Sequence, residues 1–116
     1  LHYILAFFGT WLLARRLGCH AGGALLAALS FVYGWFPPRI CLEWAIVTGA
    51  YLPWIMWCAE SFLQLRRTRY LAGLCALLTM QLFAGHFHVA FLTQLTLAIY
   101  APLRVAMASR RSHSPV

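Results

Sequence analysis

Apolar residues form five runs along the chain, separated by short polar or proline-containing breaks. The runs cover residues 1–14, 21–36, 44–63, 70–85 and 89–107. At a rise of 1.5 Å per residue, the third run reaches across the ~30 Å hydrocarbon core of a bilayer, whereas the first reaches about 21 Å. The pattern predicts an all-α fold, a polytopic transmembrane helix bundle with about five membrane segments. We expect the bundle to occupy residues 1–108, and residues 109–116 to form a polar, disordered tail.

Proline and glycine mark where these helices should end or bend. The second run stops at Pro37-Pro38, because two consecutive prolines cannot continue a helix. Pro53 lies in the middle of the third run and predicts a kink there. The stretch Gly85-His86-Phe87-His88 separates the last two runs, which would otherwise form one helix too long for a single crossing. We therefore expect a hairpin tip at this stretch.

Composition supports a membrane protein. Apolar residues make up 63% of the chain and charged residues only 9%, against about a quarter in ordinary soluble domains. The net charge is +7, all nine basic residues are arginine, and there is no aspartate. In a soluble protein this charge would indicate nucleic acid, but here the arginines lie between apolar runs. We expect anionic membrane lipids, and not nucleic acid, to be the partner.

The arginines predict the orientation of the bundle. Eight of them lie near or just beyond the ends of the first, third and fifth runs, and these three ends fall on the same side of the membrane. Only Arg39 falls on the other side. The positive-inside rule makes the arginine-rich side cytoplasmic, so the protein is expected in a bacterial cytoplasmic membrane with the Gly85–His88 turn outside.

Two further features bear on chemistry and completeness. Cys19, Cys41, Cys58 and Cys75 lie on different segments without CxxC spacing, and we interpret them as small buried residues, not as a disulfide or zinc framework. The first run begins at Leu1 and is short for a crossing. We therefore expect the chain to be part of a longer membrane protein.

Four polar residues of the outer side are the candidate binding site: Arg39, Glu43, His86 and His88. Arginine binds phosphate with two hydrogen bonds, a carboxylate orients a hydroxyl, and histidine donates to an anion. If the two outer turns converge, these groups suit a lipid that carries phosphate or sugar. Two alternatives stay open: Arg39 and Glu43 form a local ion pair at a helix start, and the histidines only solvate the turn.

Metal and haem sites are weaker hypotheses for the same histidines. On a helix, His86 and His88 would point about 200° apart and could not share one ion, and Glu43 is the only obvious outer carboxylate. We therefore expect no metal. A haem or pigment needs a single axial histidine, which either residue could supply. For Glu60, near the cytoplasmic end of its helix, we expect pairing with Arg66 or Arg67, or else a role in packing inside the bundle.

The chain resembles part of the bacterial YfhO-like membrane proteins, which belong to the GT-C class of glycosyltransferases. The matching stretches are LLARRLG at 12–18, GGALLAALSFVYGWF at 22–36, YLPWIMWCAES at 51–61 and QLFAGHFHVAF at 81–91. The Gly85-His86 pair is the most distinctive feature. The resemblance implies a helix bundle that uses polyprenyl-phosphate sugars at the outer face. It also implies a catalytic acidic residue in an outer loop upstream of Leu1.

Two hypotheses of different classes follow. In the first, the chain is a segment of a GT-C-like glycosyltransferase or glycolipid-modifying protein, inactive when isolated. In the second, it is a small non-catalytic subunit of a membrane complex, with haem or pigment as its ligand. In both, the remainder of a longer chain or other membrane subunits are expected as partners.

Overall fold

A computed structural model describes residues 1–34 and 43–112, with side chains described for residues 1–34 and 46–110. Throughout this part of the chain the regular structure is helical. The helices are α1 (His2–Arg16), α2 (Ala21–Gly34), α3 (Glu43–Gly49), α4 (Leu52–Leu65), α5 (Thr68–Phe83) and α6 (Phe87–Ser112). The expected all-α fold is therefore confirmed.

The third apolar run folds as two helices instead of one kinked helix. Helix α3 ends at Gly49, four residues before Pro53, and α4 begins at Leu52. Proline lacks an N–H group, and its ring collides with the carbonyl four residues earlier, which here belongs to Gly49. Pro53 is tolerated in the first turn of α4, where no helical partner for its nitrogen is needed. The consequence of Pro53 is a break, which is stronger than the predicted kink.

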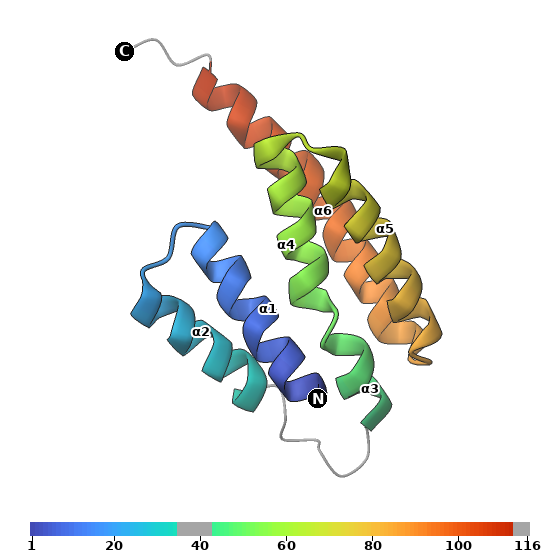
Figure 1. Cartoon of the computed structure of the whole chain (residues 1–116). Helices are drawn as coiled ribbons and strands as arrows, with labels where there is room; N and C mark the ends of the chain where they lie inside the picture. The colour runs from blue at the N-terminus through green and yellow to red at the C-terminus, as the bar shows by residue number, and fades with distance from the viewer. Residues whose placement is uncertain (35–42, 113–116) are drawn as a thin grey trace.

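The chain runs up and down the bundle, with α3 and α4 following one another in the same direction (Figure 1). Helices α1 and α2 form an antiparallel pair on one side of α4, and α5 and α6 lie on its other side. Helix α3 packs against α1, α5 and α6 at the end opposite to the C-terminus of α4. The body is elongated, with a longest extent of 54 Å.

The interface between α1 and its neighbours is made by small residues. Ala24 and Ala28 of α2 have no exposed surface, and Ala6 of α1 is buried as well. Gly9 of α1 lies so close to α4 that an added Cβ would be 2.6 Å from Nε1 of Trp54. That nitrogen donates a hydrogen bond of 2.8 Å to the carbonyl of Leu5. Small side chains thus allow close helix approach, as in membrane helix pairs.

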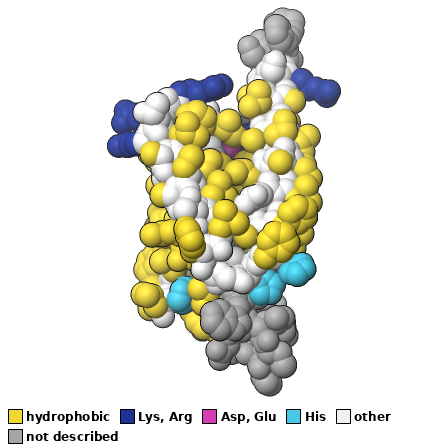
Figure 2. Space-filling view, turned by 90° about the vertical axis from the view of Figure 1, so that its right-hand side faces the viewer, with side chains coloured by type: hydrophobic (Ala, Val, Ile, Leu, Met, Phe, Trp, Pro, Cys, Tyr) yellow, Lys and Arg dark blue, Asp and Glu magenta, His cyan; other side chains and the backbone are white. Residues whose placement is uncertain are grey.

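Large apolar side chains lie on the outside of the bundle. They include, on α2, α5 and α6, the exposed residues Leu25, Leu26, Leu29, Leu71, Met80, Leu82, Phe87, Phe91, Leu92, Leu95, Ile99 and Leu103. Figure 2 shows apolar side chains over most of the face it presents, with arginines gathered toward one end and histidines toward the other. The described body therefore has an apolar belt between two polar ends, and exposed apolar patches mark surfaces that bind membranes or other proteins.

The prediction of about five helices that each span the membrane was too high, as the lengths of the helices show. Among the described residues, only Phe87–Arg110 of α6 is both long and apolar enough to cross a bilayer by itself, and Ala21–Gly34 is a shorter apolar helix. Helices α1, α2 and α5 have 15, 14 and 16 residues, or about 21–24 Å of helix. Helix α6 also continues through Ser112, so residues 109–112 of the predicted tail are helical, and 113–116 lie outside the described residues.

Candidate functional site

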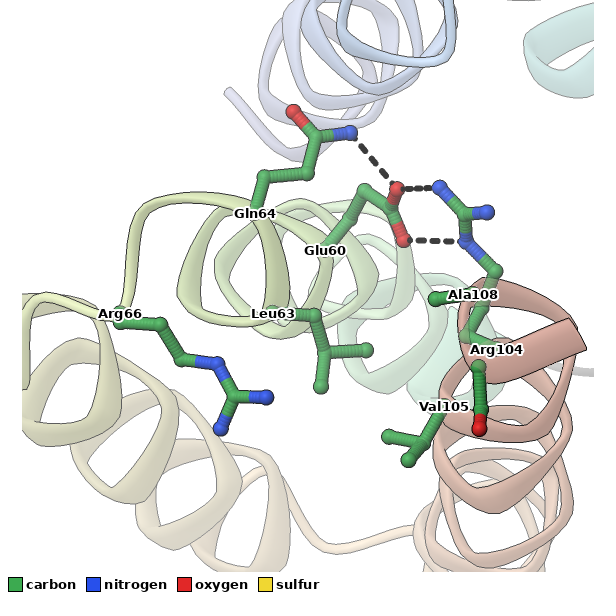
Figure 3. Close-up of a pocket in the computed structure, with 8 residues that line it drawn as sticks. Glu60, Leu63, Gln64, Arg66, Arg104, Val105 and Ala108 are labelled. Carbon is green, nitrogen blue, oxygen red and sulfur yellow. Dashed lines mark hydrogen bonds and ion pairs between the residues drawn. The ribbon is translucent and has the colours of Figure 1, made fainter. Parts of the chain in front are cut away.

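Glu60 of α4 is the centre of a buried polar cluster. Its side chain has no exposed surface, and it forms a two-point ion pair with the guanidinium of Arg104 on α6. One contact joins Nε of Arg104 to Oε2 at 3.1 Å, and the other joins Nη2 to Oε1. Tyr100 donates its hydroxyl to Oε2 at 2.7 Å, and Gln64 donates Nε2 to Oε1 at 2.7 Å. Figure 3 shows the amide and the guanidinium converging on the carboxylate.

The helical repeat explains why these four side chains meet. Glu60 and Gln64 are four residues apart on α4, and Tyr100 and Arg104 are four apart on α6, so each pair shares one face of its helix. Where the two faces meet, each of the two carboxylate oxygens of Glu60 accepts two hydrogen bonds. A buried charge is tolerated when it is paired and its remaining acceptor positions are filled. Glu60 therefore connects α4 to α6 through an ion pair in which its charge is neutralised. Because both of its oxygens are occupied, they are not available to act as a catalytic base.

A second arginine approaches α4 from its other side. Nε of Arg16, in the last turn of α1, donates to the hydroxyl of Ser61 at 3.1 Å. Ser61 has no exposed surface. Adjacent residues of α4 thus hold one arginine from α1 and one from α6. This polar layer lies toward the end of the bundle where the arginines gather (Figure 2), and it fastens three helices together.

The predicted partner of Glu60 was wrong. The pattern favoured Arg66 or Arg67, because they follow on the same helix, but the structure pairs Glu60 with Arg104, 44 residues later. Arg66 takes a left-handed backbone conformation with φ 53° at the C-terminus of α4, and the cation that pairs with Glu60 is Arg104. The alternative that we kept, a role of Glu60 in packing inside the bundle, is the one that the geometry favours.

A cavity lies beside the ion pair, between the C-terminal end of α4 and the last turns of α6. Its volume is about 410 Å³, within the range of small-ligand sites. It is lined by Glu60, Leu63, Gln64, Arg66, Arg104, Val105, Ala108 and Ser109. Figure 3 shows the guanidinium of Arg66 extending toward Leu63, with Val105 of α6 on the other side of Leu63.

A second buried polar group lies toward the opposite end of the bundle. Gln81 of α5 has no exposed surface. Its Nε2 donates to the carbonyl of Thr48 at 3.1 Å and to the hydroxyl of Thr93 at 2.8 Å. These bonds connect α5 to α3 and α6. Within the described part of the chain, Oε1 of Gln81 accepts no hydrogen bond.

The predicted hairpin tip is present between α5 and α6. Gly85 has φ 92°, a conformation that glycine adopts without the strain other residues meet. His86 is half-buried, and its Nδ1 accepts a long hydrogen bond of 3.4 Å from the backbone N–H of Val89. The ring thus caps the start of α6. His88, in the first turn, is exposed, and its ring centre lies 5.8 Å from that of His86.

The other half of the predicted binding site is not described. Arg39 lies outside the described residues, and Glu43 is the first residue of α3, with a side chain that is not described. The convergence of these two residues with the histidines therefore stays a prediction. Because α3 packs against α5 and α6, its backbone lies at the end of the bundle that carries the hairpin tip (Figure 1). Among the described residues, no group of three metal-ligating side chains occurs.

The cysteines were predicted to be small buried residues, and of the three that the structure describes only Cys58 is buried. Cys19 and Cys75 are exposed, and Cys41 lies outside the described residues. Cys75 is on the outer face of α5, where an apolar environment would receive a thiol as readily as a protein interior does. Cys19 lies in the turn after α1, beside the arginines of that helix end.

Comparison with known proteins found no family model, curated protein or solved structure that matches this chain.

Proposed function

We propose that the chain is a membrane-embedded helical module whose arginine-bearing end faces the cytoplasm. The observation that carries this proposal is the distribution of side chains on the described body. An apolar belt covers its long faces, and the charged side chains that the structure describes are at one end or paired inside (Figure 2). Such a body is stable where hydrocarbon covers the belt and water or headgroups cover the ends.

We further propose that the chain crosses the membrane five times. Helices α3 and α4 follow one another with only a proline break, so together they serve as one crossing. Helices α1, α2 and α5 are shorter than the hydrocarbon core. Long side chains such as Arg15 and Arg16 at the end of α1 can extend to the headgroups, and this makes up part of the difference between helix length and hydrocarbon thickness. The bilayer can thin around such helices for the rest.

For activity, we propose that the module belongs to a GT-C-like protein that handles polyprenyl-phosphate sugars at the outer face. The resemblance in sequence supports this activity. The chain has two carboxylates, and Glu60 is occupied by Arg104 and its neighbours. Glu43 is then the carboxylate left for the outer site, where Arg39, His86 and His88 would bind phosphate and sugar. A catalytic residue outside these 116 residues completes the enzyme, so the isolated chain should not turn over.

The membrane proposal is tested by expressing the chain in bacteria and washing the membranes with alkaline carbonate. An embedded module stays in the pellet, and release into the wash would contradict the proposal. The activity is tested separately, with purified chain in liposomes and a radiolabelled polyprenyl-phosphate sugar. We expect no transfer by the isolated chain, and turnover would make Glu43 the catalytic carboxylate. A visible absorption band in the purified protein would instead support a haem- or pigment-binding subunit.

A further inference from the structure

The cavity beside the Glu60–Arg104 pair has an excess of positive charge. Three of its lining residues are ionised: Glu60, Arg66 and Arg104. Glu60 and Arg104 neutralise one another through two contacts. Among the described residues, no partner of the Arg66 guanidinium is found, and Figure 3 shows this group extending toward Leu63 at the edge of the cavity. One uncompensated cation therefore borders the cavity.

The rest of the lining is divided between apolar and polar groups. Leu63, Val105 and Ala108 supply an apolar wall, and Ser109 supplies a hydroxyl on the last turns of α6. Arg104 is one-third exposed, so part of its guanidinium lies at the cavity surface while Glu60 holds the remainder. A ligand that fits this lining carries a single negative charge with hydrogen-bond acceptors at one end and an apolar portion at the other.

The backbone at Arg66 gives a second reason to assign it a binding role. A left-handed conformation after a helix is usually taken by glycine or asparagine, and other residues adopt it at a cost in free energy. Arg66 occupies this position with φ 53°. The side chain at this position lines the cavity.

We propose that this cavity binds a phosphodiester anion, held by Arg66 and the exposed part of Arg104, with the apolar portion of the ligand against Leu63 and Val105. Planar guanidinium groups suit phosphate because they offer paired N–H donors. The cavity lies at the arginine end of the bundle, and basic pockets between helices on the cytoplasmic side are suited to anionic lipid headgroups. The assignment rests on the proposed membrane placement for the source of the anion, an anionic phospholipid of the inner leaflet.

Native mass spectrometry of the whole chain in a non-ionic detergent tests the site. Phosphatidylglycerol should bind at least about tenfold more tightly than phosphatidylcholine, whose trimethylammonium group cancels the charge. Arg66→Gln should weaken phosphatidylglycerol binding about tenfold, as expected for the loss of one charge-assisted contact. Arg69→Gln is the matched control, because Arg69 lies in the same turn region but outside the cavity and contacts Tyr70. It should change binding less than twofold.

A cavity-filling variant makes the test independent of charge. Ala108→Leu should weaken phosphatidylglycerol binding without altering any arginine. Equal binding of the two lipids, or equal losses in Arg66→Gln and Arg69→Gln, would overturn the site and leave only a generally basic surface. Competition by millimolar inorganic phosphate would identify a free anion as the ligand, and its absence identifies the lipid. Carbonate release of the chain would contradict the membrane placement alone, because binding in detergent is measured without a bilayer.

Discussion

Glu60 and Arg104 form a two-point ion pair between α4 and α6 across 44 residues of sequence. The carboxylate is fully buried, whereas the guanidinium is one-third exposed. Tyr100 and Gln64 fill the remaining acceptor positions of the carboxylate. In an apolar bundle, such a pair specifies which faces of two helices meet, because any other rotation would leave a charge buried without a partner.

Breaking this pair should destabilise the bundle strongly. Arg104→Gln leaves the carboxylate of Glu60 buried without its cation, and we expect a loss of about 3 kcal/mol in the free energy of unfolding. Unfolding by sodium dodecyl sulfate of the protein in mixed micelles measures the effect. Arg69→Gln, which removes an exposed arginine of α5, is the control and should change stability by less than about 0.5 kcal/mol.

The double variant Glu60→Gln with Arg104→Gln decides whether the pair or its components matter. It removes both charges and keeps hydrogen-bonding groups at both positions, so stability should recover to within about 1–2 kcal/mol of the unsubstituted protein. If the double variant is less stable than Arg104→Gln, so that the losses of the two single variants add, the two residues are not partners.

The hydroxyl of Tyr100 should contribute separately. Tyr100→Phe removes one donor to Oε2 of Glu60, and we expect a loss of about 1.5 kcal/mol, typical of a hydrogen bond to a charged group. Tyr33→Phe is the matched control, because the side chain of Tyr33 is 65% exposed on α2. The same unfolding assay compares them, and equal effects of the two substitutions would argue against the hydrogen bond of Tyr100.

Two glycines of the first helical pair should respond in opposite directions to alanine. A Cβ at Gly9 would lie 2.6 Å from Nε1 of Trp54, whereas a Cβ at Gly23 would meet nothing within 4 Å. Gly9→Ala should therefore cost about 1–3 kcal/mol by displacing Trp54 and its hydrogen bond to Leu5. Gly23→Ala should be neutral or stabilise by up to about 1 kcal/mol through helix propensity. A stabilising Gly9→Ala would mean that α1 and α4 are not in close contact.

The apolar runs predicted the helices well, because their ends are marked by local chemistry. Arg15-Arg16 end the first run, and Gly85 marks the turn between α5 and α6. Helix length was overestimated for the third run, since the effect of Pro53 depends on whether a neighbouring helix holds the two halves in line. Sequence alone does not give that packing.

The buried pair was missed because its members are far apart in sequence. Glu60 has arginines close to it at 66 and 67, and a local pairing rule selects them. One signal was present: Arg104 stands inside an apolar helix with Tyr100 one turn earlier, and an arginine at such a position needs a buried anion. With two carboxylates in the chain, Glu60 was one of two available partners.

His86 provides a test of whether the hairpin tip is structural. Its Nδ1 accepts from the N–H of Val89, and the asparagine side chain can make the same cap. We expect His86→Asn to leave stability within about 0.5 kcal/mol and His86→Leu to cost about 1 kcal/mol. If the full-length protein carrying His86→Asn keeps its stability but loses activity, the histidine serves the outer binding site. Unchanged activity would assign it to the cap alone.

Cysteine labelling in intact cells tests the membrane placement most directly. Variants that keep a single cysteine are treated with a membrane-impermeant maleimide, before and after the cells are opened. Cys41, which the arginine pattern predicts to lie on the outer side, should react from outside. Cys19, exposed beside the arginines of α1, should react only after the cells are opened, and Cys75 on the apolar face of α5 should react slowly in both cases. Labelling of Cys19 but not Cys41 from outside would invert the orientation, and equal, rapid labelling of Cys75 would contradict a membrane-embedded module.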